Sequence, residues 1–400
     1  MPIRQELPIN NHILLWAREQ TKFSIDDVVA RAKIKDLKNK GISAKERLMF
    51  WESGKENPTI GELELIAKAY RRPLLTFFLP NPPMIETRLQ DFRTIGDKVI
   101  EKPSPEFDAF RRQVEVLQKG LQTLVQNDGG KPLDFIGSVK MDYLPEKLAD
   151  NMHKILGYSA DDQQKIKDSD ELFNMLRDKA GKAGIFVLRK ADLGSWHSKI
   201  TPQEFRGLAI CDNFAPLIVV NPNDAKAALP FTLIHELVHL WLGESGISSF
   251  DLLQTQKQNY QKREIYCNRT AAEFLVPSDS FLEEWRKIKN YNLDLAILSL
   301  TNTFKVSRVV IARRLLEFEK IDEDTYWNQF NQWRDEWITL REEQKHEEGG
   351  PGYFISTKSK LGTKLLETVI KAAYDGKISY GEASKMLGIK IDHFNQFYGG

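Results

Sequence analysis

The chain has 400 residues, and 41% of them are hydrophobic, which is enough apolar material for two or three cores. Its 57 basic and 56 acidic residues nearly cancel, and a net charge of +1 argues against an obligate binder of polyanions. Two cysteines are too few for a disulfide scaffold, and the sequence has no signal peptide or long apolar span, so we expect a cytoplasmic protein with no membrane attachment.

The first 83 residues form a series of short helical patterns. Ser24 is a suitable N-cap for one helix, and Gly54 is a suitable end for another. The motifs Trp-Glu-Ser-Gly at 51–54 and Pro-Thr-Ile-Gly-Glu-Leu at 58–63 make this region similar to the XRE helix-turn-helix domains of Cro and phage repressors. The resemblance implies an all-α domain over residues 1–83.

Lysines are concentrated between the second and third predicted helices of this domain. Basic side chains suit DNA phosphates, yet the candidate recognition helix, about residues 44–52, is short of the Arg, Asn and Gln side chains that read bases. Double-stranded DNA is therefore one candidate partner of this domain, and a protein is the other. The candidate DNA-binding residues are Lys38, Lys40, Lys45 and Arg47.

Residues 84–140 are predicted to connect this domain to the next one. An extended stretch at 85–105 precedes an amphipathic helix at 105–126, which ends before Asn-Asp-Gly-Gly at 127–130. The next domain is expected to begin near Met141.

Two short apolar runs, 206–211 and 216–221, are separated by Asp-Asn-Phe-Ala and predict a β-hairpin. The hairpin leads directly towards the next predicted helix. If residues 217–221 form an edge strand, an extended substrate segment can pair with it by strand addition. An ordinary core hairpin is the alternative.

The motif His-Glu-Leu-Val-His at 235–239 is the most informative feature of the chain. His235 and His239 are one turn apart on one face of a helix, so both imidazoles can reach one metal ion, with Glu236 beside it. Apolar neighbours surround the motif, and burial of these polar side chains is costly unless a metal compensates it. The pattern predicts a zinc hydrolase site. Gly243 is expected to end the helix.

Catalytic zinc generally has three protein ligands, so a third ligand must come from another segment. A helical pattern at 263–277 places Glu264 and Asn268 four residues apart on one face. Glu264 can then be the ligand while Asn268 hydrogen-bonds the far nitrogen of a ligand histidine. Glu273, about two and a half turns beyond Glu264, and Cys267, as a thiolate, are the competing candidates.

Two stretches of the sequence resemble the ImmA/IrrE metallopeptidases. They are residues 205–243, which end in Phe-Thr-Leu-Ile-His-Glu-Leu-Val-His-Leu-Trp-Leu-Gly, and residues 267–277, Cys-Asn-x-x-Ala-Ala-Glu-Phe-Leu-Val-Pro. The resemblance implies an α+β, mostly helical fold: a gluzincin-like metallopeptidase lobe with a small antiparallel sheet, flanked by all-α helix-turn-helix-like domains. The lobe with its helical cap is expected over residues 141–320.

The same resemblance implies one Zn2+ per chain. The two histidines His235 and His239 and the downstream Glu264 would hold it, and Glu236 would be the catalytic base. A side chain that stabilises the oxyanion is not singled out by the sequence. The candidates for that role are His153, His197, Tyr260 and Tyr266.

Helical patterns continue to the end of the chain. Residues 301–315 look like a second helix-turn-helix pair, for which we expect a structural role as a cap. Residues 321–352 are predicted to be a polar helix and a linker, and residues 353–400 a small helical module. This module either contacts a partner or packs back onto the body of the protein.

These inferences predict a site-specific zinc metalloendopeptidase. By analogy with the family, we expect its substrate to be a helix-turn-helix transcriptional repressor encoded nearby, whose cleavage would derepress mobile-element, defence or stress genes. The alternative is a DNA-binding transcriptional regulator or antitoxin-like protein in which the metal lobe is a sensor or a scaffold.

Overall fold

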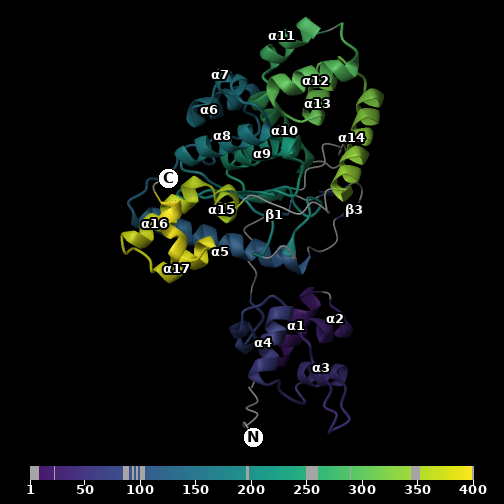
Figure 1. Ribbon diagram of the computed structural model, residues 1–400, viewed down its shortest axis with the longest axis vertical. Helices are drawn as coiled ribbons and strands as arrows, with labels where there is room; N and C mark the ends of the chain where they lie inside the picture. The colour runs from purple at the N-terminus through teal and green to yellow at the C-terminus, as the bar shows by residue number, and fades with distance from the viewer. Residues whose placement is uncertain are drawn as a thin grey trace. The chain divides into compact units, whose positions relative to one another are not determined.

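The protein is described by a computed structural model, which contains two compact units (Figure 1). The N-terminal unit comprises residues 1–87 and 101–113, and the large unit comprises residues 88–100 and 114–400. The residues that the structure describes are 9–21, 23–83, 90–91, 94–95, 98–99, 104–194, 198–248, 260–288, 290–343 and 352–398.

The N-terminal unit is all-α where it is described. Its elements are α1 (Asn11–Thr21), α2 (Ile25–Arg31), α3 (Ala44–Ser53), α4 (Ile60–Ala69) and the 3-10 helix η1 (Leu74–Phe78). Ser24 caps α2 in a capping box, and Gly54 ends α3 with a φ of 74°, as the sequence predicts. Trp51 is 1% exposed and packs in a core with Leu14 and Ile66.

The large unit has a mixed α/β core followed by helices. Its elements up to the core are α5 (Pro105–Asn127, shared with the N-terminal unit), α6 (Pro145–Leu156), α7 (Ala160–Gln164), α8 (Ser169–Lys182), β4 (Phe186–Arg189), β5 (Gly207–Ile210), β6 (Leu217–Val220), η3 (Lys226–Ala228), α9 (Leu229–Trp241), β7 (Gly246–Ser248) and α10 (Tyr260–Leu275). The mostly helical α+β fold class expected from the sequence is confirmed.

The sheet of the large unit is mixed, so the prediction of an antiparallel sheet is wrong in part. Its strand order is β1-β7-β5-β6-β4, where β1 is Gln90–Asp91. The predicted hairpin is present because β5 pairs antiparallel with β6, but β4 pairs parallel with β6, and β1 pairs parallel with β7. Strands β2 (Thr94–Ile95) and β3 (Lys98–Val99) form a separate two-stranded pair.

The position of β6 decides between the two alternatives for residues 217–221, an edge strand or a strand of an ordinary core hairpin. Because β4 lies on one side of β6 and β5 on the other, the hydrogen-bonding groups of β6 are already used by its neighbours. The segment is therefore a central strand, and a substrate cannot add to it.

Helix α9 is the centre of the large unit. It contacts β5 and β6 of the sheet as well as α8 and α10 (Figure 1), and every one of its residues is buried. This environment suits its apolar side chains, but it also removes the polar side chains of the helix from water. Gly243, with a φ of 75°, follows the helix as predicted.

A helical cap follows α10. Its helices are α11 (Ser278–Ile288), α12 (Leu293–Phe304), α13 (Arg308–Glu317) and α14 (Glu323–Glu343). Helices α12 and α13 meet at 110°, an angle found in helix-turn-helix pairs. Within the described part of the chain, no single helix combines the length and the apolar character needed to cross a membrane.

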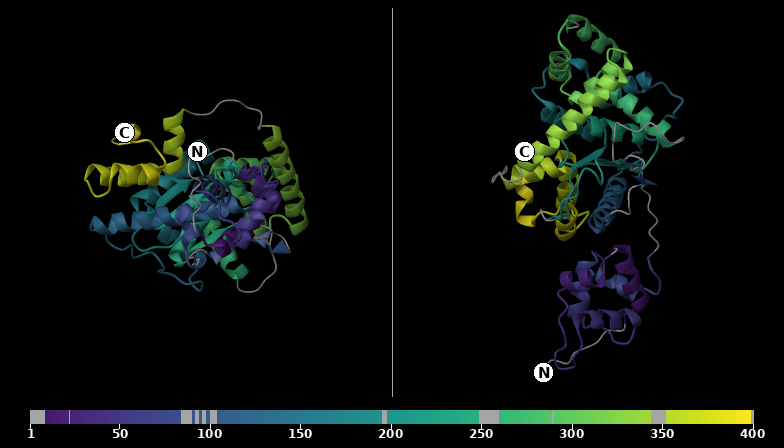
Figure 2. Two further views of the ribbon diagram at one scale, coloured as in Figure 1. Left: turned by 90° about the horizontal axis from the view of Figure 1, so that it is seen from below. Right: turned by 90° about the vertical axis from the view of Figure 1, so that its right-hand side faces the viewer.

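The C-terminal helices pack back onto the large unit. They are α15 (Tyr353–Leu361), α16 (Thr363–Tyr374), α17 (Tyr380–Leu387), η5 (Ile391–His393) and α18 (Phe394–Phe397). Helices α15 and α16 contact the outer strand β4, and α16 also contacts α8. Figure 2 shows the same helices beside the end of α5, where Lys377 forms an ion pair with Asp128.

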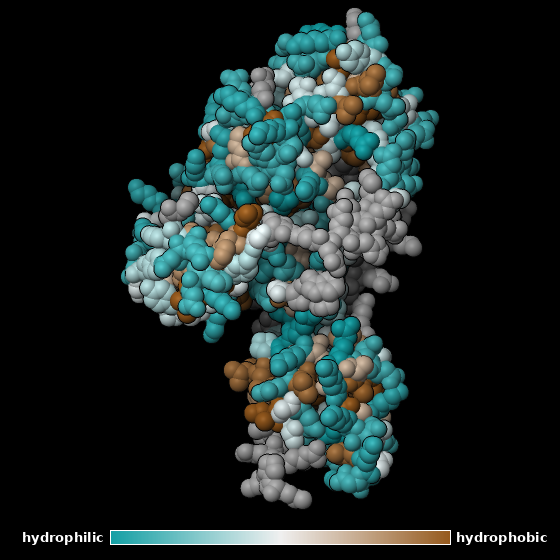
Figure 3. All heavy atoms as spheres, in the orientation of Figure 1, coloured by the Kyte–Doolittle hydropathy of each residue, from teal (hydrophilic) through white to brown (hydrophobic). Residues whose placement is uncertain are grey.

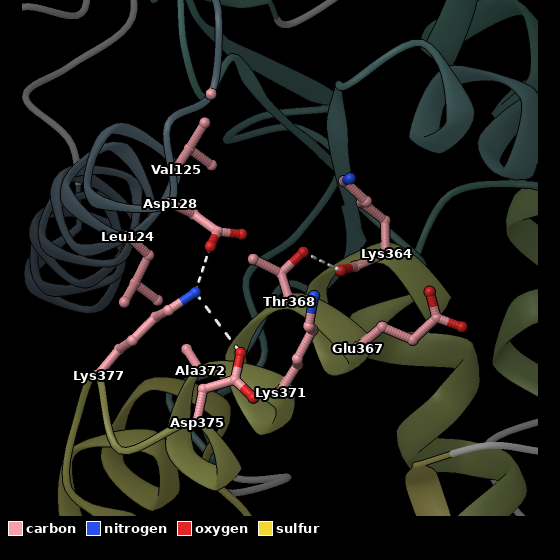
Figure 4. Close-up of a pocket in the computed structure, with 11 residues that line it drawn as sticks. Leu124, Val125, Asp128, Lys364, Glu367, Thr368, Lys371, Ala372, Asp375 and Lys377 are labelled. Carbon is pink, nitrogen blue, oxygen red and sulfur yellow. Dashed lines mark hydrogen bonds and ion pairs between the residues drawn. The ribbon is translucent and has the colours of Figure 1, made fainter.

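A cavity of about 310 Å³ lies at this junction between α5 and α16. Figure 4 shows Lys377 reaching both Asp128 and Asp375 across it. The cavity is lined by both basic and acidic side chains. On α16 these are Lys364, Glu367 and Lys371. None of the residues that line it belongs to the metal site described below.

Candidate metal centre

Three side chains from two helices converge on one point. His235 and His239 come from α9, and their Nε2 atoms are 3.2 Å apart. Glu264 comes from α10, with Oε2 at 3.1 Å from Nε2 of His235 and Oε1 at 3.4 Å from Nε2 of His239. Three bonds of about 2.0–2.1 Å at tetrahedral angles place ligand atoms about 3.3 Å apart. The three donors are therefore spaced to hold one metal ion.

The orientation of His235 is fixed from behind. Its Nδ1 lies 2.8 Å from Oδ1 of Asn268, one turn after Glu264 on α10. Because an amide oxygen can only accept a hydrogen bond, Nδ1 carries the proton and Nε2 presents its lone pair to the site. As their spacing predicted, Glu264 and Asn268 face the same way, and both contact His235.

The far side of His239 has a different environment. Sγ of Cys267 and Oε2 of Glu244 each lie 3.8 Å from its Nδ1. Glu244 in turn forms an ion pair with Arg263, with Nε at 2.9 Å from Oε1. Sequence reasoning missed Glu244 and Arg263. Glu244 follows the end of α9, and only the turn there brings its side chain close to His239, where Arg263 pairs with it.

The side chains of the cluster shift one another's pKa values. Burial alone would raise the pKa of Glu264, but the neighbouring His235 and His239 outweigh burial and hold that pKa below its usual range. Burial lowers the pKa of His239, while Cys267, Glu244 and Glu264 raise it, and the result is a pKa well above the usual value. Both shifts reflect the attraction between the imidazoles and the acidic side chains that face them.

Glu236 lies on α9 next to His235, and its side chain is 0% exposed. Its carboxylate packs against Gly207, the first residue of β5. Glu236 is therefore a buried carboxylate that directly follows a candidate metal ligand in the sequence. Gly207 was also missed by sequence reasoning, because only the packing of β5 on α9 brings the two residues together.

The competing ligand candidates lie elsewhere. Cys267 faces Nδ1 of His239 and not the Nε2 atoms that converge, so it is behind the site. Glu273 accepts hydrogen bonds from Arg314 and Ser278 at 2.6 and 2.7 Å. Arg314 is 2% exposed, so this ion pair anchors α13 to the end of α10 and has a structural role.

Of the four candidates for the oxyanion-stabilising role, the structure describes the side chains of His153 and Tyr266. Neither of these two faces the metal cluster. His153 is bound through Nε2 to the carbonyl oxygen of Phe274 at 2.9 Å, away from the metal cluster. Tyr266 is two residues after Glu264, on the opposite side of α10. His197 and the side chain of Tyr260 lie outside the described residues.

The candidate DNA-binding residues have two kinds of environment. Lys38, Lys40 and Lys45 are exposed, and Lys45 forms an ion pair with Asp26. Arg47 differs from the expectation, because it is 5% exposed and its guanidinium is held inside the N-terminal unit. It donates to the carbonyl oxygen of Lys35 at 2.8 Å, forms an ion pair with Glu62 and lies over the ring of Trp51.

Comparison with known proteins identifies the region around the metal cluster. A family model described as the IrrE N-terminal-like domain matches residues 180–316, a range that runs from the end of α8 into α13. No curated protein and no solved structure matches the chain. The matched range includes His235, Glu236, His239 and Glu264. The match supports a metallopeptidase of the ImmA/IrrE kind for residues 180–316.

Proposed function

We propose that the protein is a zinc-dependent, site-specific metalloendopeptidase. The observation that carries this proposal is the convergence of His235, His239 and Glu264 beside the buried carboxylate of Glu236. An N,N,O donor set at tetrahedral spacing suits Zn2+, because two imidazoles and one carboxylate leave a fourth position open. Each chain has one such cluster among its described residues.

Each residue of the site has a separate task in peptide-bond hydrolysis. Zinc, when bound, polarises the scissile carbonyl group and lowers the pKa of a water molecule. Glu236 accepts the proton of the attacking water and later delivers it to the leaving amine. Asn268 keeps the ring of His235 in its orientation, and the apolar residues of α9 exclude bulk water from the site.

The proposed substrate is a helix-turn-helix repressor encoded near the gene of this protein. This part of the proposal rests on the resemblance to the ImmA/IrrE family. A folded helix cannot present its peptide bonds to a metal site without local unfolding, so cleavage should occur in a flexible loop or at a helix end. Since β6 is a central strand, this substrate segment does not add to residues 217–221.

The N-terminal unit supports a second candidate function, a transcriptional regulator that uses the metal lobe as a sensor or scaffold. Exposed lysines favour double-stranded DNA as its partner. Exposed apolar side chains, which Figure 3 shows in brown on this unit, favour a protein partner instead. The largest are Met49, Ile60, Leu65, Leu75, Phe78 and Leu79.

A cleavage assay separates these two functions. Zinc-loaded protein is incubated with the neighbouring repressor and, separately, with unfolded casein, and products are identified by mass spectrometry. We expect cleavage of the repressor at one or a few sites, little digestion of casein, and loss of cleavage with a zinc chelator. Absence of cleavage at full zinc occupancy would favour the regulator, and many-site digestion of casein would indicate a general protease.

A further inference from the structure

Gly207 has the closest contact with the proposed catalytic base of any glycine in the described chain. A Cβ atom built on Gly207 would lie 2.1 Å from Oε1 of Glu236 and 2.6 Å from its Cδ and Cγ atoms. Such distances are far below any van der Waals contact. Gly207 also lacks a positive φ, so its backbone is one that any residue can adopt. A glycine is needed here for space and not for conformation.

Neither partner of this contact can move away easily. Gly207 is paired with Val220 of β6 on one side and Ser248 of β7 on the other, which fixes its backbone. Glu236 is fully buried on a helix whose residues are all buried. A methyl group at position 207 must therefore displace the side chain of Glu236, because the two backbones are held by the core.

We infer that Gly207 is a positioning residue for Glu236. Because Gly207 has no side chain, the Glu236 carboxylate can occupy the space in front of it. The backbone of β5 thereby limits where the Glu236 side chain can lie. This inference rests on the proposed function for the part that concerns turnover. Its steric part concerns folding alone and can be tested without a substrate.

The steric part is tested by a cycle of thermal denaturation measurements. Gly207→Ala should lower Tm by about 5 °C, the scale of an overpacked core in a unit of this size. In the background of Glu236→Ala the same substitution should cost less than about 1 °C, because the atoms that the methyl group meets have been removed. Equal costs in the two backgrounds would overturn the inference.

Gly381→Ala is the matched control. Gly381 is also in the large unit, on α17, and a Cβ atom there would lie 3.9 Å from the nearest atom, Oγ of Ser379. This variant should keep the Tm and the activity of the parent protein. A loss of Tm equal to that of Gly207→Ala would show that added methyl groups are generally harmful, which would also overturn the inference.

The positioning part is tested by turnover of the neighbouring repressor, together with metal analysis. Gly207→Ala should retain zinc and KM but lose about 100-fold in kcat, the effect of misplacing a reacting group by about 1 Å. The matched Gly381→Ala variant should keep the kcat of the parent protein, so the comparison isolates the methyl group that meets Glu236.

Two outcomes are distinguishable. If the parent protein binds zinc and cleaves, but Gly207→Ala keeps the kcat of the parent protein, the positioning role is wrong and the proposed function stands. If the parent protein does not cleave any substrate, the proposed function fails and the positioning role fails with it, while the Tm cycle still decides the steric contact.

Discussion

Two glutamates on α10 share a helix but have opposite surroundings. Glu264 faces the Nε2 atoms of His235 and His239. Glu273 instead faces the buried guanidinium of Arg314. Helical spacing predicts that these carboxylates point in different directions. It does not decide which of them meets His235 and His239, because that choice depends on how α10 packs against α9.

Glu264→Ala should abolish tight zinc binding, and Asn268→Ala should weaken it by roughly 10 to 100-fold, since Asn268 acts only through His235. Glu273→Ala should leave zinc affinity nearly unchanged. Competition with a chelating dye measures all three affinities. If Glu273→Ala loses zinc while Glu264→Ala keeps it, the ligand assignment is wrong.

Glu273→Ala also has its own expected effect, because Arg314 loses a buried hydrogen-bond acceptor. We expect a loss of roughly 1.5–3 kcal/mol in the free energy of unfolding. Denaturant titration of the zinc-loaded protein measures it. The control is Glu283→Ala, since Glu283 pairs with Lys287 at an exposed position and should contribute little.

At the scale of elements, α9 and the glycine that follows it were predictable from sequence, because the spacing of apolar residues and a helix-ending glycine are both local features of the chain. The β5–β6 hairpin was predictable for the same reason. The place of β4 was not, because its parallel pairing with β6 is a contact between distant segments that no local pattern encodes. The choice between an edge strand and a core hairpin at residues 217–221 depends on this strand, and the burial of Arg47 likewise depends on a partner, Glu62, from another helix.

The contact between α6 and α10 should be sensitive to pH through His153. Burial lowers the pKa of His153 below its usual value, although its hydrogen bond to the carbonyl of Phe274 acts in the opposite direction. The unfolded chain, with a pKa of about 6.5, therefore binds this proton first as pH falls. Stability from neutral His153 is complete above about pH 6.5 and is lost as pH falls towards the lower folded pKa.

Thermal melts of the parent protein and His153→Gln test this expectation. Between pH 7.5 and about 5.5 the parent should lose more Tm than the variant, because only the parent has this titrating group. Between about pH 7.5 and 8.5 the two should have the same pH dependence. A parent that gains stability relative to His153→Gln on acidification would show that the sign of the pKa shift is wrong.

At the scale of the whole molecule, the chain joins a region that matches a metallopeptidase family to an N-terminal unit that lies outside the match. If that unit binds double-stranded DNA, affinity of the full chain should fall steeply with added salt. Replacing the exposed Lys38, Lys40 and Lys45 by Ala should flatten the dependence by about one unit of log–log slope for each lost phosphate contact.

Fluorescence anisotropy with a labelled duplex at several salt concentrations measures this slope. Lys55→Ala is a suitable control, since Lys55 follows α3 and lies over the ring of Phe50. Binding that is absent or insensitive to salt would leave the N-terminal unit as a module for protein partners.

The central claim is that Glu236 moves protons at a site in which His235, His239 and Glu264 hold the metal. The most direct test is zinc content and repressor cleavage measured on one preparation each of the parent protein and Glu236→Gln. We predict equal zinc stoichiometry of one per chain, with cleavage by the variant reduced by at least about 100-fold. Loss of zinc from the variant would make Glu236 a ligand, and unchanged cleavage would remove it from the reaction; either result would contradict the assignment.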